Sequence, residues 1–314
     1  MPVTVVFGGS GFIGSHLVAD LLNKGRQVVV ADVVRPASLA PGAGFWECDV
    51  RQPLDRDLEA EIVYNLAAVH RTPGHPDHEY YDTNVGGALN ITAWAVQTAV
   101  RRLCFTSSIS VYGPTETPKD ETSPLRPNSA YGRSKLLAEQ IHREWASSDS
   151  NRRLAVVRPA VVFGPGEHGN FTRLAAALRR RRFVYPGRRN TLKACGYVSD
   201  LIRALQESVD LADPIFTCNY CYPVVSSIEQ ICDTFQRVAG YPAPPALPAP
   251  VMRAALAMLS ALPATPLDAD RVRKLVASTN IVPKALVDSG FRWETDLASG
   301  LRRWRDADPR GHFV

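Results

Sequence analysis

The stretch Val3-Thr4-Val5-Val6-Phe7 runs directly into Gly8-Gly9-Ser10-Gly11-Phe12-Ile13-Gly14, and these residues decide the fold. Residues 3–7 are mostly β-branched or aromatic, which is typical of a strand buried on both faces. Residues 8–14 have the spacing G-x-x-G-x-x-G, and the next stretch, 12–23, carries apolar residues at helical intervals. The order strand, glycine turn, helix is the arrangement that binds the pyrophosphate of a dinucleotide.

The three glycines of this spacing have separate tasks. Gly8 permits the tight turn, Gly11 lets the backbone approach a phosphate, and Gly14 allows the helix to pack closely on the strand. The N–H groups and the dipole at the start of the helix attract phosphate. We therefore predict that a dinucleotide contacts Gly8, Gly11, Phe12, Ile13 and Gly14.

Asp32 indicates which dinucleotide is bound. It ends a second predicted strand, Gln27–Ala31, 18 residues after Gly14. A carboxylate there accepts hydrogen bonds from the ribose hydroxyls and repels a 2′-phosphate, so NAD is favoured over NADP. Arg35 lies close in sequence and is expected to offset part of that repulsion.

Strand and helix patterns alternate over about the first 160 residues, which predicts an α/β protein with a Rossmann-type, doubly wound parallel sheet. The predicted strands include Ile62–Leu66, Arg102–Thr106 and Leu154–Val157. Beyond residue 165 the alternation weakens, which indicates a smaller C-terminal substrate-binding lobe. We expect an NAD-binding domain at 1–165, to which 193–212 returns, and a lobe formed by 166–192 and 213–314.

Composition excludes several classes of protein. The chain has 314 residues, 45% apolar and 21% charged, with a formal net charge of +5, as a folded domain requires. The basic run Arg179–Arg182 matches no nucleic-acid module. The apolar stretch Val251–Leu262 is too short to span a bilayer, no secretory signal is evident, and Cys218-x-x-Cys221 has no second pair to complete a metal site. We expect a cytoplasmic protein with reduced cysteines, no metal, no nucleic-acid partner and no membrane insertion.

Two further motifs indicate chemistry. Tyr131-Gly132-Arg133-Ser134-Lys135 places a tyrosine and a lysine four residues apart, on one face of a predicted helix. A nearby ammonium group stabilises tyrosinate, so the phenol can exchange a proton near neutral pH. The cluster Thr106-Ser107-Ser108-Ile109-Ser110 follows a buried strand and precedes Tyr131 by 23 residues, counted from Ser108. Its hydroxyls either bind a substrate oxygen while the tyrosine transfers the proton, or serve as turn residues.

With these motifs the chain resembles the extended short-chain dehydrogenase/reductases, in particular the UDP-galactose 4-epimerase-like nucleotide-sugar epimerases. The resemblance covers most of the chain to about Leu205. It implies that Ser108, Tyr131 and Lys135 are the catalytic residues, with Lys135 also holding the nicotinamide ribose. The motif Arg158-Pro159-Ala160-Val161-Val162-Phe163-Gly164-Pro165-Gly166 matches the family's R-P-x-x-V-x-G-P-G beside the nicotinamide and the substrate.

The same resemblance assigns further contacts residue by residue. For the cofactor it implies Asp49, Val50, Leu66, Ala67, Ala68, Asn84, Ser107, Tyr131, Lys135, Pro159 and Val162, with His70 where the epimerases have a lysine. For the substrate it implies Ser108, Ser110, Tyr131, Asn170 and Lys193. Val161 replaces an asparagine that touches the sugar in the epimerases, so the identity of the sugar stays open.

The reaction expected from these residues is NAD-dependent epimerisation of a UDP- or GDP-linked sugar at C4 through a keto intermediate. The alternatives are reduction or dehydrogenation of a 4-keto-6-deoxy nucleotide sugar, a 3β-hydroxysteroid-type dehydrogenase, and a non-catalytic NAD-binding protein. Dehydration is disfavoured because Ser108-Ile109 replaces the Asp-Glu pair of the family's dehydratases. Helices predicted over Asn84–Ala99 and Tyr131–Ala146 are expected to pair in a homodimer.

Overall fold

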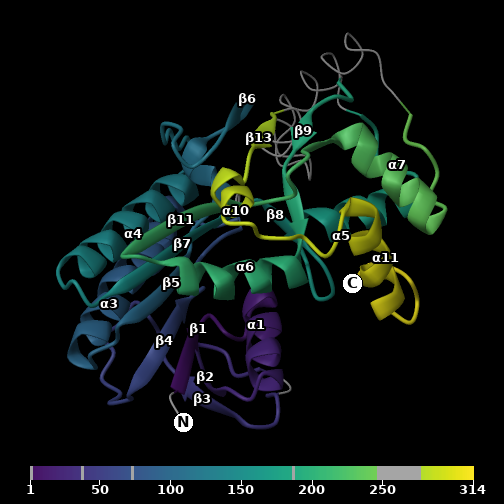
Figure 1. Cartoon of the computed structure of the whole chain (residues 1–314). Helices are drawn as coiled ribbons and strands as arrows, with labels where there is room; N and C mark the ends of the chain where they lie inside the picture. The colour runs from purple at the N-terminus through teal and green to yellow at the C-terminus, as the bar shows by residue number, and fades with distance from the viewer. Residues whose placement is uncertain (1–2, 37–38, 72–73, 186–187, 246–276) are drawn as a thin grey trace.

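A computed structural model describes residues 3–36, 39–71, 74–185, 188–245 and 277–314 (Figure 1). The apolar stretch 251–262 singled out in the sequence lies outside these residues. Of the helices in the described part of the chain, none is long and apolar enough to cross a membrane.

A seven-stranded sheet, parallel throughout, forms the centre of the larger part of the molecule. The chain enters at an interior strand, fills one edge, and then returns past this first strand to fill the other edge, which confirms the doubly wound fold predicted. In spatial order the strands are β11 (Ile215–Tyr220), β7 (Arg153–Pro159), β5 (Arg102–Thr106), β4 (Ala60–Asn65), β1 (Val3–Phe7), β2 (Gln27–Asp32) and β3 (Ala43–Glu47).

Both faces of this sheet are covered, because successive strand residues point to opposite sides. Val5 packs in a core with α3 (Gly87–Gln97) and α4 (Ala130–Ser147). Val6 packs in a second core on the opposite face, against α1 (Phe12–Asn23), α6 (Val198–Leu211) and α10 (Lys284–Asp288) (Figure 1). Two buried faces explain why the strands read as continuous apolar runs.

A smaller lobe lies beside the sheet and has its own aromatic core (Figure 1). Its helices are α5 (Asn170–Arg179), α7 (Ile228–Ala239) and α11 (Leu297–Ala307). Phe163 stacks on Phe171 with ring centroids 4.6 Å apart, and Trp304 packs edge-on against Phe313 at 5.2 Å. The lobe is therefore held by aromatic burial rather than by extension of the central sheet.

Short strands join the two parts. A four-stranded sheet has the order β12 (Ser226–Ser227), β9 (Leu192–Lys193), β13 (Thr279–Ile281) and β6 (Thr115–Lys119). A separate pair is formed by β8 (Val161–Phe163) and β10 (Cys195–Tyr197). The remaining short elements are α2 (Asp77–Tyr81), a π-helix at Asp82–Gly86 and a 3₁₀ turn at Ile109–Tyr112.

The boundaries expected between the two parts need correction at two places. Strand β11 lies after residue 212 but pairs with β7 in the central sheet, because its apolar residues complete the edge of that sheet. Strand β6 lies before residue 165 but pairs with β13 in the four-stranded sheet. Both pairings join segments far apart in sequence, which local patterns do not reveal.

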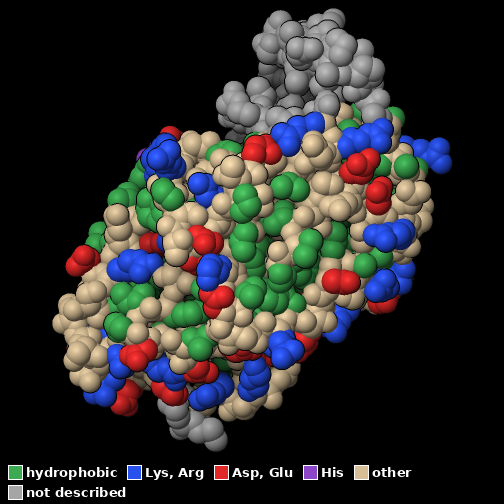
Figure 2. All heavy atoms as spheres, turned by 45° about the horizontal axis from the view of Figure 1, so that its top comes forward, with side chains coloured by type: hydrophobic (Ala, Val, Ile, Leu, Met, Phe, Trp, Pro, Cys, Tyr) green, Lys and Arg blue, Asp and Glu red, His purple; other side chains and the backbone are tan. Residues whose placement is uncertain are grey.

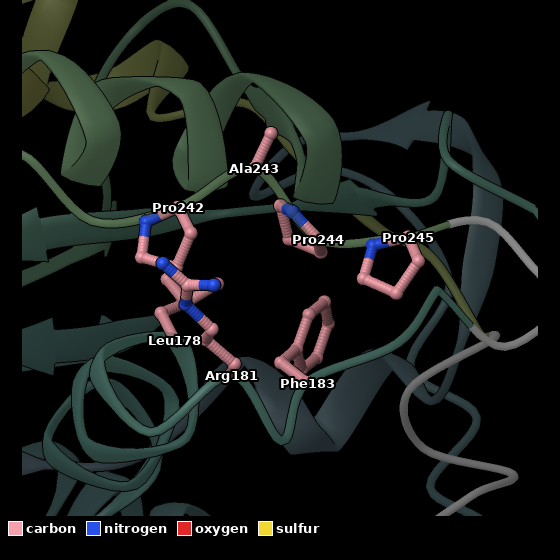
Figure 3. Close-up of a pocket in the computed structure, with 7 residues that line it drawn as sticks. All are labelled: Leu178, Arg181, Phe183, Pro242, Ala243, Pro244 and Pro245. Carbon is pink, nitrogen blue, oxygen red and sulfur yellow. The ribbon is translucent and has the colours of Figure 1, made fainter.

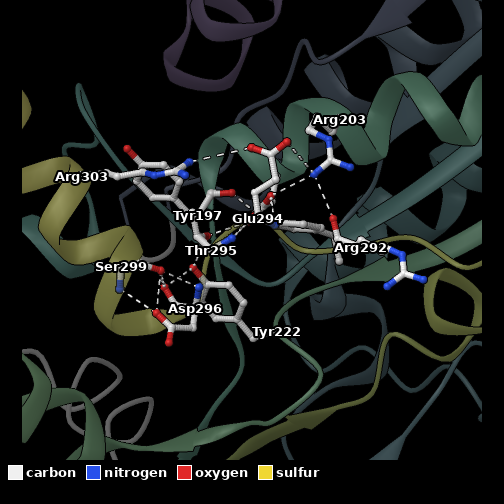
Figure 4. A network of polar contacts seen from close by, with 11 residues as sticks. Tyr197, Arg203, Tyr222, Arg292, Glu294, Thr295, Asp296, Ser299 and Arg303 are labelled. Atoms are coloured by element: carbon white, nitrogen blue, oxygen red, sulfur yellow. Dashed lines mark hydrogen bonds and ion pairs between the residues drawn. The ribbon is translucent and has the colours of Figure 1, made fainter.

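A buried carboxylate fixes the C-terminal segment against α6, beside an ion pair of Arg203 and Glu294 that Figure 4 shows. Asp200 is fully buried, and its carboxylate accepts hydrogen bonds from the backbone N–H of Glu294 at 2.9 Å and from the Thr295 hydroxyl at 2.7 Å. Arg203 forms an ion pair with Glu294 at 3.2 Å and donates to the Arg292 carbonyl. This network holds the segment that immediately precedes α11 of the lobe.

Charges of both signs are mixed on the face shown in Figure 2, where hydrophobic side chains gather in the middle. Lys and Arg side chains alternate there with Asp and Glu, so this face carries no stripe of a single sign.

Candidate active site

The glycine turn has the shape that a bound phosphate requires. Gly8 has φ +75°, and a Cβ on it would lie 2.7 Å from the backbone N of Ala67. A Cβ on Gly14 would lie 2.2 Å from the carbonyl oxygen of Gly8, so the helix touches the turn at that residue. Gly11 is exposed, and no side chain caps the first N–H groups of α1. The open donors and the bare backbone fit a pyrophosphate at this helix terminus.

The carboxylate of Asp32 lies against the same turn. It accepts hydrogen bonds from the backbone N–H of Ser10 at 3.0 Å and of Val34 at 3.3 Å. This places an acidic group beside the phosphate site, as recognition of an adenosine ribose requires. The Arg35 guanidinium stacks over the Phe45 ring, 5.4 Å from its centroid. Phe12 and Ile13 are half-buried and pack against the core beneath the turn.

Asp49 and Val50 follow β3 at one edge of the sheet. The Asp49 carboxylate binds Arg51, which lowers its pKa. Val50 is buried, and its carbonyl accepts a hydrogen bond from the Asn90 side chain at 2.8 Å. The arginine on Asp49 is a contact that sequence reasoning missed, although the spacing of two residues is a signal for it.

Asn84 connects the segment after β4 to α4. Its side chain accepts from the backbone N–H of Val69 at 3.0 Å, donates to the Val69 carbonyl at 3.1 Å, and donates to the Ser134 hydroxyl at 2.9 Å. Asn84 is buried and lies in the π-helix, which turns its amide inward. The predicted cofactor residues Leu66, Ala67 and Ala68 precede Val69, and the side chain of His70, next in the chain, is exposed.

The structure brings the three predicted catalytic residues together. The Ser129 hydroxyl caps α4 by accepting from the Gly132 N–H at 3.1 Å, so Tyr131 lies in the first helical turn. Ser108 lies beside its phenol, close enough to act on the pKa of that group through a hydrogen bond. Lys135 lies one turn further along and donates from Nζ to the carbonyl of Thr106 at 2.7 Å.

Burial shifts the pKa values of both titratable groups in this set. It raises the pKa of Tyr131, and the hydrogen bond from Ser108 opposes that rise. Burial lowers the pKa of Lys135 from 10.5 to about 7, while the negative charge of Glu139 opposes that fall. Both effects follow from the removal of a charged form from water. The pKa of the Lys135 ammonium is thereby brought close to neutral, whereas the pKa of the Tyr131 phenol moves further above it.

The Ser107 hydroxyl is hydrogen-bonded within the protein. It donates to the buried carboxylate of Glu139 at 2.5 Å, and the same carboxylate binds Arg158. The Ser108 hydroxyl donates a hydrogen bond to the Ser110 hydroxyl at 3.1 Å. Sequence reasoning missed Glu139, although its position four residues after Lys135 on a helix is a signal for a shared face.

The residues predicted to contact substrate on the lobe side lie on separate elements. Asn170 is exposed at the start of α5 and accepts a hydrogen bond from Arg173 at 3.1 Å. Lys193, on β9, donates to the Ala277 carbonyl at 2.7 Å, and burial lowers its pKa to about 8. Pro159 ends β7, and Val162 packs from β8 onto the core below α6.

A cavity of about 260 Å³ lies elsewhere in the lobe (Figure 3). It is lined by Leu178, Arg181 and Phe183 at the end of α5 and by the segment 242–245. None of the residues predicted for catalysis, cofactor or substrate lines it.

Cys218 and Cys221 contact different segments of the chain. The Cys218 thiol lies 3.4 Å from the Ser208 hydroxyl, whereas the Cys221 thiol faces the Ile281 carbonyl at 3.3 Å, so the two sulfurs point to opposite sides of the strand and its continuation. Burial raises the pKa of both thiols. Over the ranges that the structure describes, no group of three His, Cys, Asp or Glu side chains is placed to hold a metal ion.

The fold and site define an NAD-dependent enzyme of the extended short-chain dehydrogenase/reductase type. The chain belongs to the NAD dependent epimerase/dehydratase family, whose model matches residues 4–212. NAD is the cofactor of that family, and the glycine turn and Asp32 fit it.

Relatives of the chain carry names of epimerases. It is 32% identical over 214 residues to the N-acetyl-alpha-D-glucosaminyl-diphospho-ditrans,octacis-undecaprenol 4-epimerase of Escherichia coli O157:H7, covering 64% of this chain and 61% of the relative. It is 30% identical over 177 residues to a UDP-glucose 4-epimerase of Lactobacillus helveticus, covering 53% of each. The matches therefore span between about half and three fifths of these relatives.

Solved structures match over nearly the whole chain. A UDP-galactose 4-epimerase superposes with a TM-score of 0.73 at 25% identity, covering 96% of this chain and 97% of the other. MoeE5, solved with UDP-glucose and NAD, also gives 0.73 at 25% identity, covering 96% of each chain. An NDP-hexosamine 5,6-dehydratase, TunA, gives 0.78 at 23% identity over 99% of each chain, which shows the shared fold.

Proposed function

We propose that the chain is a 4-epimerase acting on a sugar attached to a diphosphate, with a UDP- or GDP-linked sugar as its substrate. One observation carries the proposal: the grouping of Ser108 with Tyr131, and of Lys135 on the next helical turn, in a fold whose glycine turn fits NAD. The names of the relatives support the reaction type.

The chain's own residues would move the proton. Tyr131 takes the proton of the C4 hydroxyl as the carbon is oxidised, and Ser108 hydrogen-bonds the same oxygen. NAD, when bound, would accept the hydride from C4 and would give it back to the opposite face of the 4-keto sugar. After the 4-keto sugar turns its other face to the site, Tyr131 returns the proton and the inverted alcohol forms. Lys135 stabilises the tyrosinate and contacts the ribose of the cofactor.

The site lacks the carboxyl groups that elimination of water requires. The residue after Ser108 is Ile109, which is 8% exposed and packs in an apolar cluster with Val111. An apolar side chain at that position neither donates nor accepts a proton, so epimerisation is favoured over dehydration.

Substrate binding is proposed for the lobe, at residues 166–192 and in the described parts that follow β11. Asn170 and Lys193 would contact the diphosphate, Asn170 with its amide at the start of α5 and Lys193 with its ammonium. The relatives are named for a sugar on undecaprenyl diphosphate and for UDP-glucose. Both of these compounds carry the sugar on a diphosphate. Turnover assays with a nucleotide-linked sugar and with a polyprenyl-linked sugar would show which of the two this chain uses.

We further propose that two copies of the chain pair through α3 and α4. Leu89 and Val96 on α3 are 54% and 52% exposed, and Leu137 on α4 is 41% exposed. Apolar side chains on two adjacent helices are the surface that a two-fold helix bundle buries. Light scattering on Leu89→Arg should then report a monomer where the unaltered protein is a dimer; a monomer in both samples would exclude the dimer.

The function is tested on the purified protein in two steps. Mass spectrometry and absorbance show whether NAD is retained, and proton NMR follows UDP- and GDP-hexoses and a polyprenyl-diphosphate hexosamine, with Tyr131→Phe as the matched control. Conversion to the C4 epimer without net NADH, lost in the control, supports the epimerase and identifies the carrier. Net consumption of NADH with a keto sugar would instead identify a reductase and exclude the epimerase.

A further inference from the structure

Glu139 is buried within the catalytic helix, one turn after Lys135. It is 1% exposed, and its two carboxylate oxygens bind Arg158, with Nε at 2.8 Å and Nη2 at 2.6 Å. Its Oε1 also accepts the hydroxyl of Ser107 at 2.5 Å. A buried carboxylate is stable only when it is paired and hydrogen-bonded, and this one has both kinds of partner.

The contacts continue from Arg158 across the sheet. Its Nη1 donates to the hydroxyl of Tyr112 at 2.7 Å, and that hydroxyl donates to the side chain of Asn219 at 2.8 Å. Asn219 lies on β11, and Tyr112 ends the 3₁₀ turn that begins just after Ser108. Through these contacts the Glu139 carboxylate connects α4, β7 and β11 with Ser107 and Tyr112, the two residues that flank the segment 108–111.

Ser107 is the residue through which this network meets the catalytic serine. Its backbone N–H pairs with the Val157 carbonyl at 2.7 Å, which continues β5 beyond Thr106. Ser108 has φ −163° and ψ 150°, an extended conformation. Neighbouring side chains on an extended segment point to opposite sides. With the Ser107 hydroxyl held inward on Glu139, the Ser108 hydroxyl lies on the opposite side, where it bonds the Ser110 hydroxyl at 3.1 Å and lies beside the Tyr131 phenol.

We propose that Ser107, anchored by the Glu139–Arg158 ion pair, is a positioning residue that directs the Ser108 hydroxyl toward Tyr131. The inference rests on the proposed function, because it assigns to Ser107 no contact with substrate and a role only through Ser108. Without its anchor, the segment from Ser107 to Ser110 keeps its backbone pairing but loses the side-chain contact that fixes its orientation.

Ser107→Ala tests this better than a change at Glu139. Removing the carboxylate leaves the Arg158 charge buried without its partner, which is strongly destabilising and can prevent folding. Ser107→Ala leaves that ion pair intact. The matched control is Ser208→Ala, because Ser208 is also a fully buried serine, with its hydroxyl 3.4 Å from Cys218 on the other face of the sheet.

A double-mutant cycle on kcat gives the first readout. Ser108→Ala is expected to lower kcat on the order of 100-fold, as loss of a hydrogen bond to the reacting oxygen does. Ser107→Ala should lower kcat by about 10-fold to 100-fold with little change in KM. In the Ser108→Ala background it should have no further effect, since its role is exercised through that hydroxyl. Where Ser108→Ala itself lowers kcat, effects that multiply, or no effect of Ser107→Ala alone, would overturn the proposal.

A second readout needs no substrate. The ¹³Cζ resonance of Tyr131, identified by its absence in Tyr131→Phe, reports the hydrogen bond from Ser108. At pH 8 Ser107→Ala and Ser108→Ala should displace it to the same extent, while Ser208→Ala leaves it in place. An undisplaced resonance in Ser107→Ala refutes the positioning role. If the resonance moves but Ser108→Ala leaves turnover unchanged, the positioning stands and the proposed catalytic role of Ser108 fails.

Discussion

Replacement of Lys135 by methionine should stabilise the protein stripped of NAD at pH 7. Lys135 is 2% exposed, and its pKa is lowered from 10.5 to about 7. At about 1.4 kcal/mol per pH unit, the buried ammonium lowers the free energy of unfolding by on the order of 4–5 kcal/mol at neutral pH. Methionine retains most of the volume but loses the hydrogen bond to the Thr106 carbonyl, about 1 kcal/mol.

The pH dependence has a definite sign. Between pH 7 and pH 10.5 the unfolded chain holds a proton on Lys135 that the folded chain has released, so the stability contributed at this residue rises with pH. From pH 7 to pH 9 the original protein should gain about 2 kcal/mol relative to Lys135→Met. The loss of neutral contacts is the same at both pH values and cancels from this comparison.

The measurement is urea unfolding of both proteins at pH 7 and pH 9, followed by circular dichroism. Lys24→Met is the control, because Lys24 is exposed and pairs with Asp20 at 2.8 Å on the surface. Its effect should be within about 0.5 kcal/mol. A Lys135→Met protein less stable than the original by the same amount at both pH values would show that the buried ammonium does not destabilise the fold.

Three further outcomes are expected. Tyr131→Phe should lower kcat by about 10²–10⁴-fold while NAD stays bound, measured by NMR turnover and absorbance; equal kcat would exclude Tyr131 as the proton carrier. Gly14→Ala should abolish NAD retention, because its Cβ would lie 2.2 Å from the Gly8 carbonyl oxygen, whereas Gly86→Ala, with nothing within 4 Å, should retain it. In binding titrations, Asp32→Ala should lower the ratio of the affinity for NAD to the affinity for NADP. An unchanged ratio would show that Asp32 does not recognise the ribose.

Much of the site follows from local sequence. The turn from Gly8 to Gly14 and the pair Tyr131 and Lys135 each lie within one strand–turn–helix or one helical turn, so spacing alone fixes which groups are neighbours. Asp32 could be assigned because a parallel sheet places the end of its strand beside the first turn. The role of Ser108 is implied by the resemblance alone, because no local spacing connects it with Tyr131, 23 positions further along the chain.

The tertiary structure decided the contacts between distant segments. The place of β11 at the edge of the central sheet and the pairing of β6 with β13 join residues that no periodicity connects. The direction of Ser107, inward to Glu139, depended on a helix residue 32 positions away in sequence. A local pattern states which residues can share a face, but only packing determines which face meets which partner. For this reason the sequence determined the turn, the helix and the reacting groups of this enzyme, and the fold alone determined what holds them in position.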